Sequence, residues 1–242
     1  MSGPIDLVCF PENSLYLRLV EGEKIPPLAI DNEAITRLSR RARELKCFIH
    51  IGSVPLKSEG GLYNASLLID RSGGVHDVYR KIHLFDVDVA GHKPVRESDA
   101  FKHGSKPSVF EVNGWKIGSS ICYDLRFAEL YSGYAKQGVD AIVIPSAFLV
   151  PTGKAHWDVL TRARAIESQA YVLAAAQGGR HVGKTGKTRD TFGHSVIVDP
   201  WGVVVESLSD DFGQRRVLRA RLEKARIREV RGQIPMSGHR RL

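Results

Sequence analysis

Cysteine is scarce in this sequence of 242 residues, which contains only three. An odd number of irregularly spaced cysteines argues against a disulfide framework and for a reducing compartment. Apolar runs of membrane-spanning length are missing too, so we expect no transmembrane helix and no membrane partner. The opening residues, MSGPID, lack a basic segment followed by an apolar stretch, so we expect no secretory signal. Together these absences predict a cytoplasmic protein.

Acidic residues are also in deficit, with 27 against 35 basic residues and a net charge of +8. Much of the basic excess lies near the C-terminus, between Arg215 and Arg241. A nucleic-acid-binding surface would interleave aromatic side chains with these bases, yet no Phe, Tyr or Trp follows Phe212. We therefore expect a solvated face or a contact between subunits there, and no nucleic-acid partner.

The remaining composition is ordinary, with 43% hydrophobic and 26% charged residues in a chain long enough for one sizeable α/β domain. Helices interleaved with strands favour sheets covered by helices. A long loop is expected from residue 83 to about 106, and no linker or repeat divides the predicted single domain, 1–242. Apolar periodicity and turn residues predict helices at 31–45, 125–138, 156–169 and 223–233, and strands at 5–10, 47–54, 63–70, 75–82, 107–112, 115–122, 140–148, 170–177, 194–199, 203–208 and 214–222.

Cys122 lies where a strand pattern becomes a helix pattern. The apolar residues before it are typical of a buried strand, and the stretch 125–136 is typical of an amphipathic helix. The first N–H groups and the dipole of such a helix would lower the pKa of the thiol and stabilise an oxyanion. Cys9 and Cys47 lie in apolar strand-like runs and are expected to be structural. Cys122 is therefore the candidate nucleophile, with an inert buried cysteine as the alternative.

Four further residues are candidates for a site. Glu12 directly follows a strand, where open α/β sheets place their ligands, although a turn cap would explain it as well. Lys81 lies in an aromatic and apolar stretch, so it is either held in a site or extends to solvent along apolar surface. Glu97 lies in a polar loop typical of a solvated charge. His156 is expected to open a helix, as a capping or packing residue.

Together these residues indicate a type of reaction. A cysteine hydrolase acting on a C–N bond needs a nucleophile, a proton shuttle and an oxyanion stabiliser. Cys122, Glu12 and Lys81 can supply these three roles in that order. A cysteine–histidine pair is the common alternative, and His83 and His156 are its candidates.

A Walker-A pattern occurs at residues 178–185, GGRHVGKT, after an apolar strand. A phosphate-binding loop needs a helix that begins at its Lys-Thr pair. Here the chain continues with glycines, threonines and no apolar periodicity, so we expect a flexible polar loop instead. No His, Cys and Asp cluster has the spacing of metal ligands, and no metal is predicted.

Eight strings distributed over nearly the whole chain resemble the carbon–nitrogen hydrolases of the nitrilase superfamily. The resemblance implies a four-layer αββα sandwich and a Glu–Lys–Cys triad formed by Glu12, Lys81 and Cys122, with Glu97 as a second active-site glutamate. It implies no cofactor. The strings are Phe10–Glu12, Tyr63–Ser66, Tyr79–Asp86, Ile121–Phe127, Pro145–Phe148, Thr152–Trp157, Arg162–Glu167 and Gly193–Gly202.

By this analogy the Cys122 thiolate attacks an amide carbonyl and forms a thioester. Lys81 and the backbone N–H of Tyr123 would stabilise the oxyanion. Glu12 would protonate the departing amine and then activate water.

The chain is most similar to the Nit branch, which includes deaminated-glutathione amidases and ω-amidases. Its substrates are small amides of 2-oxo acids, which implies deaminated glutathione here, with 2-oxoglutaramate as the alternative. Arg126, Phe148 and Thr152 match the substrate-pocket positions of this branch, and His156 belongs to the same matched strings. A guanidinium suits bidentate carboxylate binding. The resemblance also implies a homodimer or a higher homo-oligomer.

The start of the sequence differs from the family pattern. Members begin with a core strand and a helix ahead of the Pro-Glu strand, whereas this sequence begins almost on that strand. We expect this to expose a sheet edge and apolar surface. A catalytically silent family member that acts as an interaction protein is therefore the alternative of another class.

Overall fold

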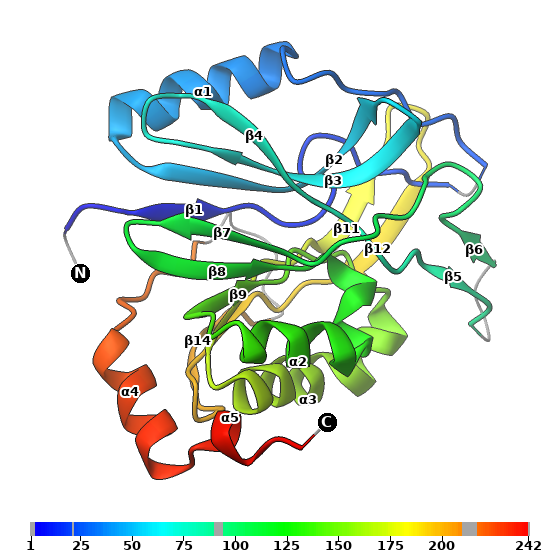
Figure 1. The fold of residues 1–242 in the computed structure, drawn as a ribbon. Coiled ribbons are helices and arrows are strands. Elements are labelled where there is room, and N and C mark those ends of the chain that lie inside the picture. The colour runs from blue at the N-terminus through cyan, green and yellow to red at the C-terminus, as the bar shows by residue number, and fades with distance from the viewer. Residues whose placement is uncertain (1–2, 21, 90–93, 210–216, 242) are drawn as a thin grey trace.

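The computed structural model describes residues 3–20, 22–89, 94–209 and 217–241, and these residues form a four-layer αββα sandwich. Figure 1 shows the layers from top to bottom: one helix, a first sheet, a second sheet and a pair of helices. The outer layers are α1 (Glu33–Leu45) on one side, and α2 (Ala128–Lys136) with α3 (Val150–Ser168) on the other. The fold class expected from the family resemblance is confirmed.

The first sheet has the order β1-β2-β3-β4, with β1 parallel to β2 and the other pairs antiparallel. Since β1 stands at one end of this order, it forms one edge of the described sheet. The strands are β1 (Leu7–Cys9), β2 (Phe48–Ser58), β3 (Gly61–Ile69) and β4 (Val75–Arg80).

The second sheet has the order β14-β13-β10-β9-β8-β7. Its central strands β8, β9 and β10 run parallel, as expected for strands joined by helices. The strands are β7 (Ser108–Val112), β8 (Trp115–Ser119), β9 (Ala141–Val143), β10 (Tyr171–Ala174), β13 (Val196–Val198) and β14 (Val204–Ser207).

Three apolar interfaces hold the layers together. Ile35 and Ala42 on α1 pack onto the first sheet, and Asn32 caps this helix by accepting from the Ala34 N–H. Phe48 of the first sheet packs among residues of the second sheet between the two layers. The third interface lies under the second sheet and includes Leu130, Tyr131, Ile142, Ile144 and Trp157.

Several predicted element bounds need correction. The strand expected at 115–122 ends at Ser119, and residues Cys122–Arg126 form a short 3-10 helix, η1. The helix expected at 156–169 begins at Val150, because a proline occupies its first turn, where the missing N–H costs nothing. His156 therefore lies inside α3 and does not open it. Within the expected loop 83–106 lies a small hairpin, β5 (Asp86–Val87) with β6 (Val95–Arg96).

The prediction of a flexible polar loop at the Walker-A pattern was wrong for residues 178–182, whereas residues 183–185 lie in a turn. Residues Gly178–Val182 (β11) and Thr188–Phe192 (β12) form an antiparallel hairpin. The glycines and threonines that break helical periodicity are compatible with a two-stranded ribbon, whose threonines are good strand formers. No helix begins at Lys184 or Thr185, so the phosphate-binding-loop interpretation fails.

The C-terminal region contains α4 (Lys224–Gln233) and α5 (Met236–His239). Of the strand predicted at 214–222, residues 217–222 form no strand, and residues 214–216 lie outside the described residues. None of the helices in the described parts of the chain combines the length and the apolar character needed to cross a bilayer.

Candidate active site

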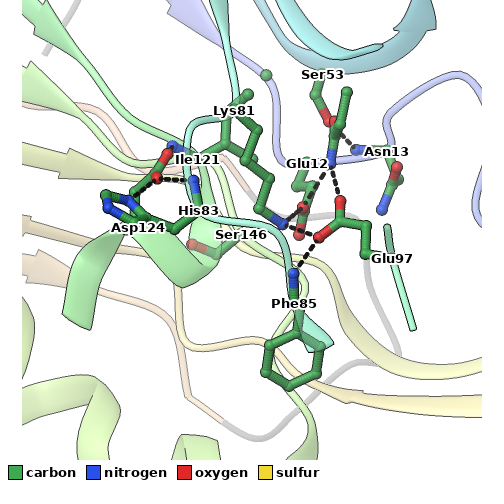
Figure 2. Close-up of polar contacts among 12 residues, drawn as sticks. Glu12, Asn13, Ser53, Lys81, His83, Phe85, Glu97, Ile121, Asp124 and Ser146 are labelled. Carbon is green, nitrogen blue, oxygen red and sulfur yellow. Dashed lines mark hydrogen bonds and ion pairs between the residues drawn. The ribbon is translucent and has the colours of Figure 1, made fainter. Parts of the chain in front are cut away.

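Lys81 occupies the centre of a buried polar cluster (Figure 2). Its Nζ lies 2.9 Å from Oε1 of Glu12 and 2.8 Å from Oε2 of Glu97. Asn64, on β3, donates through Nδ2 to both carboxylates, at 3.0 Å to Glu12 and 2.8 Å to Glu97. All four side chains are buried. The structure thus brings together three of the predicted site residues around one ammonium group, and adds Asn64, which we did not predict.

Glu12 is positioned by a turn that follows β1. The next residue, Asn13, has a φ of 57°, and its N–H donates to Oγ of Ser53 at 3.0 Å. Gly52 lies against this turn, where a Cβ would stand 2.2 Å from the carbonyl oxygen of Phe10. Only glycine allows this approach of the two backbones, so the position of the carboxylate depends on it.

Two carboxylates keep Lys81 charged. Burial alone would lower the pKa of Lys81, but Glu12 and Glu97 outweigh it and hold the pKa well above its ordinary value. Glu97 is fixed in turn by the backbone N–H of Phe85, which donates to Oε2 at 2.7 Å. The site therefore contains a cation held by two carboxylates, which Asn64 and the Phe85 N–H fix in turn.

Cys122 is the first residue of η1 and has a left-handed backbone, with a φ of 49°. A non-glycine residue in this conformation is strained, and such strain is common at functional sites. The Cys122 N–H donates to the Pro145 carbonyl at 2.9 Å, which helps to hold the turn. The thiol is buried and lines the same pocket as Glu12, Lys81 and Glu97.

The prediction of a lowered thiol pKa was wrong. Burial raises the pKa of Cys122 well above its ordinary value, and the neighbouring Glu12 carboxylate raises it further. Lys81 and the Ala147 N–H act in the opposite direction without reversing the shift. The expected α-helix N-terminus is missing here, because η1 is a single short 3-10 turn and α2 begins only at Ala128. The thiol is consequently protonated at neutral pH, beside a carboxylate.

Asp124 links the turn that contains Cys122 to the segment that contains Lys81. Its buried carboxylate accepts from the Ile121 N–H at 2.9 Å, directly before Cys122. It also accepts from the His83 N–H at 3.0 Å, two residues after Lys81 (Figure 2), and from the Tyr79 hydroxyl at 2.8 Å. One side chain therefore joins the chain segments that carry the thiol and the ammonium group.

The cluster opens into a pocket whose empty space, with the open solvent at its mouth included, is about 650 Å³. Arg126, Phe148 and Thr152 line it, as does Tyr123. The Arg126 guanidinium lies over the rings of Tyr123 at 5.8 Å and Phe148 at 5.4 Å. These predicted substrate residues share one cavity with Cys122.

His156, in contrast, does not line this pocket among the residues that the structure describes. Its Nδ1 lies 3.0 Å from Nη1 of Arg126, so the ring accepts from the guanidinium and orients it. Thr152, one turn before His156 on α3, lines the pocket instead. That His156 itself contacts substrate stays a prediction.

The cysteine–histidine alternative finds no support in the geometry. His83 places Nδ1 2.7 Å from Asp124 and stacks on Phe127 at 3.6 Å, and it does not line the described pocket. Over the described ranges, no group of three or more His, Cys, Asp and Glu side chains is arranged to hold a metal ion.

Two lining arginines, Arg18 and Arg189, were missed by sequence reasoning. Arg189 lies on β12, in the segment that we expected to be a loop, and Arg18 lies in the irregular segment after Glu12. Their only signal in the sequence is charge, which a chain with many basic residues does not distinguish.

The sequence profile of the family described as carbon-nitrogen hydrolase matches residues 1–232. The chain belongs to the carbon-nitrogen hydrolase family. This membership agrees with the buried Glu, Lys and Cys side chains and with the sandwich fold.

Curated proteins similar to this hydrolase carry two names. A deaminated glutathione amidase from Yersinia enterocolitica is 36% identical over 252 residues, covering 100% of this chain and 84% of its own. One from Rattus norvegicus is 41% identical over 219 residues, covering 88% of this chain and 64% of its own length. An omega-amidase from Xenopus tropicalis is 39% identical over 219 residues, covering 90% and 75%.

Solved structures resemble this hydrolase over almost its whole length. The NitFhit protein of C. elegans superposes with a TM-score of 0.80 at 33% identity, covering 98% of this chain and 57% of that one. A Saccharomyces cerevisiae member of branch 10 of the nitrilase superfamily gives a TM-score of 0.79 at 28% identity, covering 98% and 83%.

Proposed function

We propose that this protein is an amidase in which Cys122 is the nucleophile and a thioester is the intermediate. The observation that carries the proposal is the convergence of four groups in one pocket. The strained Cys122 and the Lys81 ammonium lie together with the carboxylates of Glu12 and Glu97. This set supplies a nucleophile, a cation for an oxyanion and a base, which are the parts that amide hydrolysis requires.

Acylation begins with a protonated thiol, because the pKa of Cys122 is raised. Glu12 accepts the thiol proton as the sulfur attacks the amide carbonyl carbon, and the oxyanion is stabilised by Lys81 and the Tyr123 N–H. The C–N bond then breaks as Glu12 returns that proton to the departing amine. The products of this half-reaction are a free amine and a Cys122 thioester.

Deacylation uses the same base in the same way. Water attacks the thioester carbon while Glu12 takes one of its protons, and the same donors stabilise the second oxyanion. The C–S bond breaks, the proton returns to the Cys122 sulfur, and a carboxylic acid leaves. Removal of an oxyanion donor is expected to slow the reaction roughly a hundredfold or more.

We infer that the substrate is a small 2-oxo acid amide, with deaminated glutathione as the first candidate. The named relatives favour this candidate, and 2-oxoglutaramate is the alternative because of the omega-amidase relative. Arg126, oriented by His156 and placed on two aromatic rings, is suited to the 2-oxo acid carboxylate. Cytoplasmic location and a homodimeric or higher assembly stay predictions.

The test compares the unmutated chain with Cys122→Ala on both substrates. We expect the unmutated chain to release cysteinylglycine or ammonia and, after an acid quench, to show a covalent 2-oxoglutaryl adduct by mass spectrometry. Cys122→Ala should lose both while keeping the circular dichroism spectrum. Cys9→Ala is the matched control, since Cys9 does not line the described pocket. Absence of hydrolysis and of adduct in the unmutated chain would favour the interaction-protein alternative.

A further inference from the structure

Cations outnumber carboxylates around the pocket. Its two carboxylates, Glu12 and Glu97, both pair with Lys81. The lining thus has four cationic side chains and two carboxylates. A lining with more cationic than anionic side chains suits an anionic ligand. The guanidinium groups in the lining are those of Arg18, Arg126 and Arg189.

The three arginines come from two separate parts of the fold. Arg126 is the last residue of η1, which begins at Cys122. Arg18 and Arg189 come from the segment after Glu12 and from β12, and they adjoin each other, because Nη1 of Arg189 donates to the Arg18 carbonyl at 2.9 Å. A ligand that fills the pocket can thus meet one guanidinium at Arg126 and two others at the Arg18–Arg189 pair.

The hairpin directs Arg189 toward the pocket. Side chains alternate along a strand, so Arg189 and its neighbour Asp190 point to opposite faces. Asp190 pairs with Arg180 across the hairpin, at 3.0 Å. Within the described ranges Arg189 forms no ion pair with a carboxylate, although it lines a pocket that contains two.

We propose that Arg18 and Arg189 form a second anion subsite, which binds a carboxylate on the leaving-group side of the scissile amide. The inference rests on the proposed amidase function and specifies its substrate class. Arg126 takes the 2-oxo acid carboxylate, Cys122 attacks the amide, and the Arg18–Arg189 pair takes the far carboxylate. Deaminated glutathione carries a carboxylate at each end, whereas 2-oxoglutaramate releases only ammonia. The subsite therefore selects the first substrate over the second.

The test removes each partner of the proposed contact in turn. The substrates are deaminated glutathione and the same molecule with its glycine carboxylate converted to a carboxamide, which keeps the scissile bond. We expect the unmutated chain to prefer the carboxylate form by about tenfold or more in kcat/KM, mostly through KM, because a charge-assisted contact is lost. Arg189→Gln should reduce that preference to near parity.

Controls separate a binding role from a structural one. Arg180→Gln removes the same charge from the same hairpin at an exposed position, and it should keep the full preference of the unmutated chain. Arg189→Lys keeps the charge and should restore part of the preference. A loss in Arg189→Gln that is equal on both substrates would overturn the subsite, because Arg189 would then merely hold the Arg18 backbone.

A third substrate, 2-oxoglutaramate, distinguishes failure of the subsite from failure of the amidase proposal. An unmutated chain that hydrolyses the carboxylate and carboxamide forms equally well, or hydrolyses only 2-oxoglutaramate, overturns the subsite and leaves the amidase in place. Hydrolysis of none of the three substrates overturns the proposed function, and the subsite with it.

Discussion

At the scale of single residues, the site contains a charged ammonium group and, next to it, an uncharged thiol. Lys81 stays charged although it is buried, because two carboxylates hold its pKa up. Cys122 stays neutral, because burial and Glu12 raise its pKa. In the proposed reaction, a neutral thiol beside a carboxylate means that the thiolate forms only as its proton moves to Glu12. The proposed base is thus as necessary as the sulfur.

Glu12→Gln tests this division of roles. The change removes the carboxylate that raises the pKa of Cys122, so the apparent pKa of the thiol should fall. Hydrolysis should slow by about a hundredfold or more, because no general base remains. The pH dependence of iodoacetamide alkylation measures the first effect, and steady-state amide hydrolysis measures the second. An apparent thiol pKa that stays the same or rises would contradict the proposed role of Glu12.

The site residues that sequence reasoning found share a local signal. Glu12 and Cys122 each follow a strand, and Lys81 interrupts an aromatic and apolar stretch. Asn64, Arg18 and Arg189 have no such signal, because their roles depend on which strands and segments the topology places together. Sequence patterns indicate local structure only. Arg18 and Arg189 line the same pocket although 171 positions separate them in the sequence.

At the scale of elements, α3 and the β11–β12 hairpin support each other next to the pocket. Gly153 in the first turns of α3 faces Phe192 at the end of β12, and a Cβ there would stand 2.1 Å from Cγ of the ring. Phe192 is not free to retreat, since its N–H donates to the Phe148 carbonyl at 2.9 Å. The missing side chain of Gly153 therefore sets how closely the helix approaches the hairpin.

Gly153→Ala should consequently destabilise the protein. Overpacking against the base of a ring costs about 1–3 kcal/mol, which exceeds the benefit of alanine in a helix. Gly133→Ala in α2 is the matched control, because a Cβ there meets nothing within 4 Å. It should stabilise the protein by about 0.5–1 kcal/mol. Urea unfolding of both variants measures the difference, and equal effects would refute the steric argument.

At the scale of the whole molecule, the alternation of strands and helices predicted the covered sheets, and the resemblance predicted their number of layers. The hairpin at 178–192 was not predicted, because its glycines and threonines are equally typical of an irregular loop. Tertiary contacts decide its structure. The N–H of Phe192 donates to the Phe148 carbonyl, and Nη1 of Arg189 donates to the Arg18 carbonyl. Such contacts leave no period in the sequence.

His50 on β2 is buried between the two sheets, and its burial makes the free energy of unfolding depend on pH. Its ring is fully buried, stacks on Phe110 of β7 at 5.7 Å, and has no hydrogen-bond partner on either nitrogen among the described residues. Burial lowers its pKa from 6.5 to about 3. Between these two values the unfolded chain binds a proton that the folded protein excludes. Acid therefore favours unfolding, and stability is lost as the pH falls from 6.5 toward 3.

His50→Phe should remove this term while keeping an aromatic ring against Phe110. Between pH 7 and pH 5 the free energy of unfolding of the unmutated protein should fall by about 2 kcal/mol more than that of the variant. Urea titrations at both pH values measure this difference, from which any constant packing cost of the larger ring cancels. Substitution of the exposed His239 by Gln should leave the pH dependence intact. Parallel pH dependences in the unmutated protein and His50→Phe would mean that the sheets open enough to hydrate His50 before unfolding.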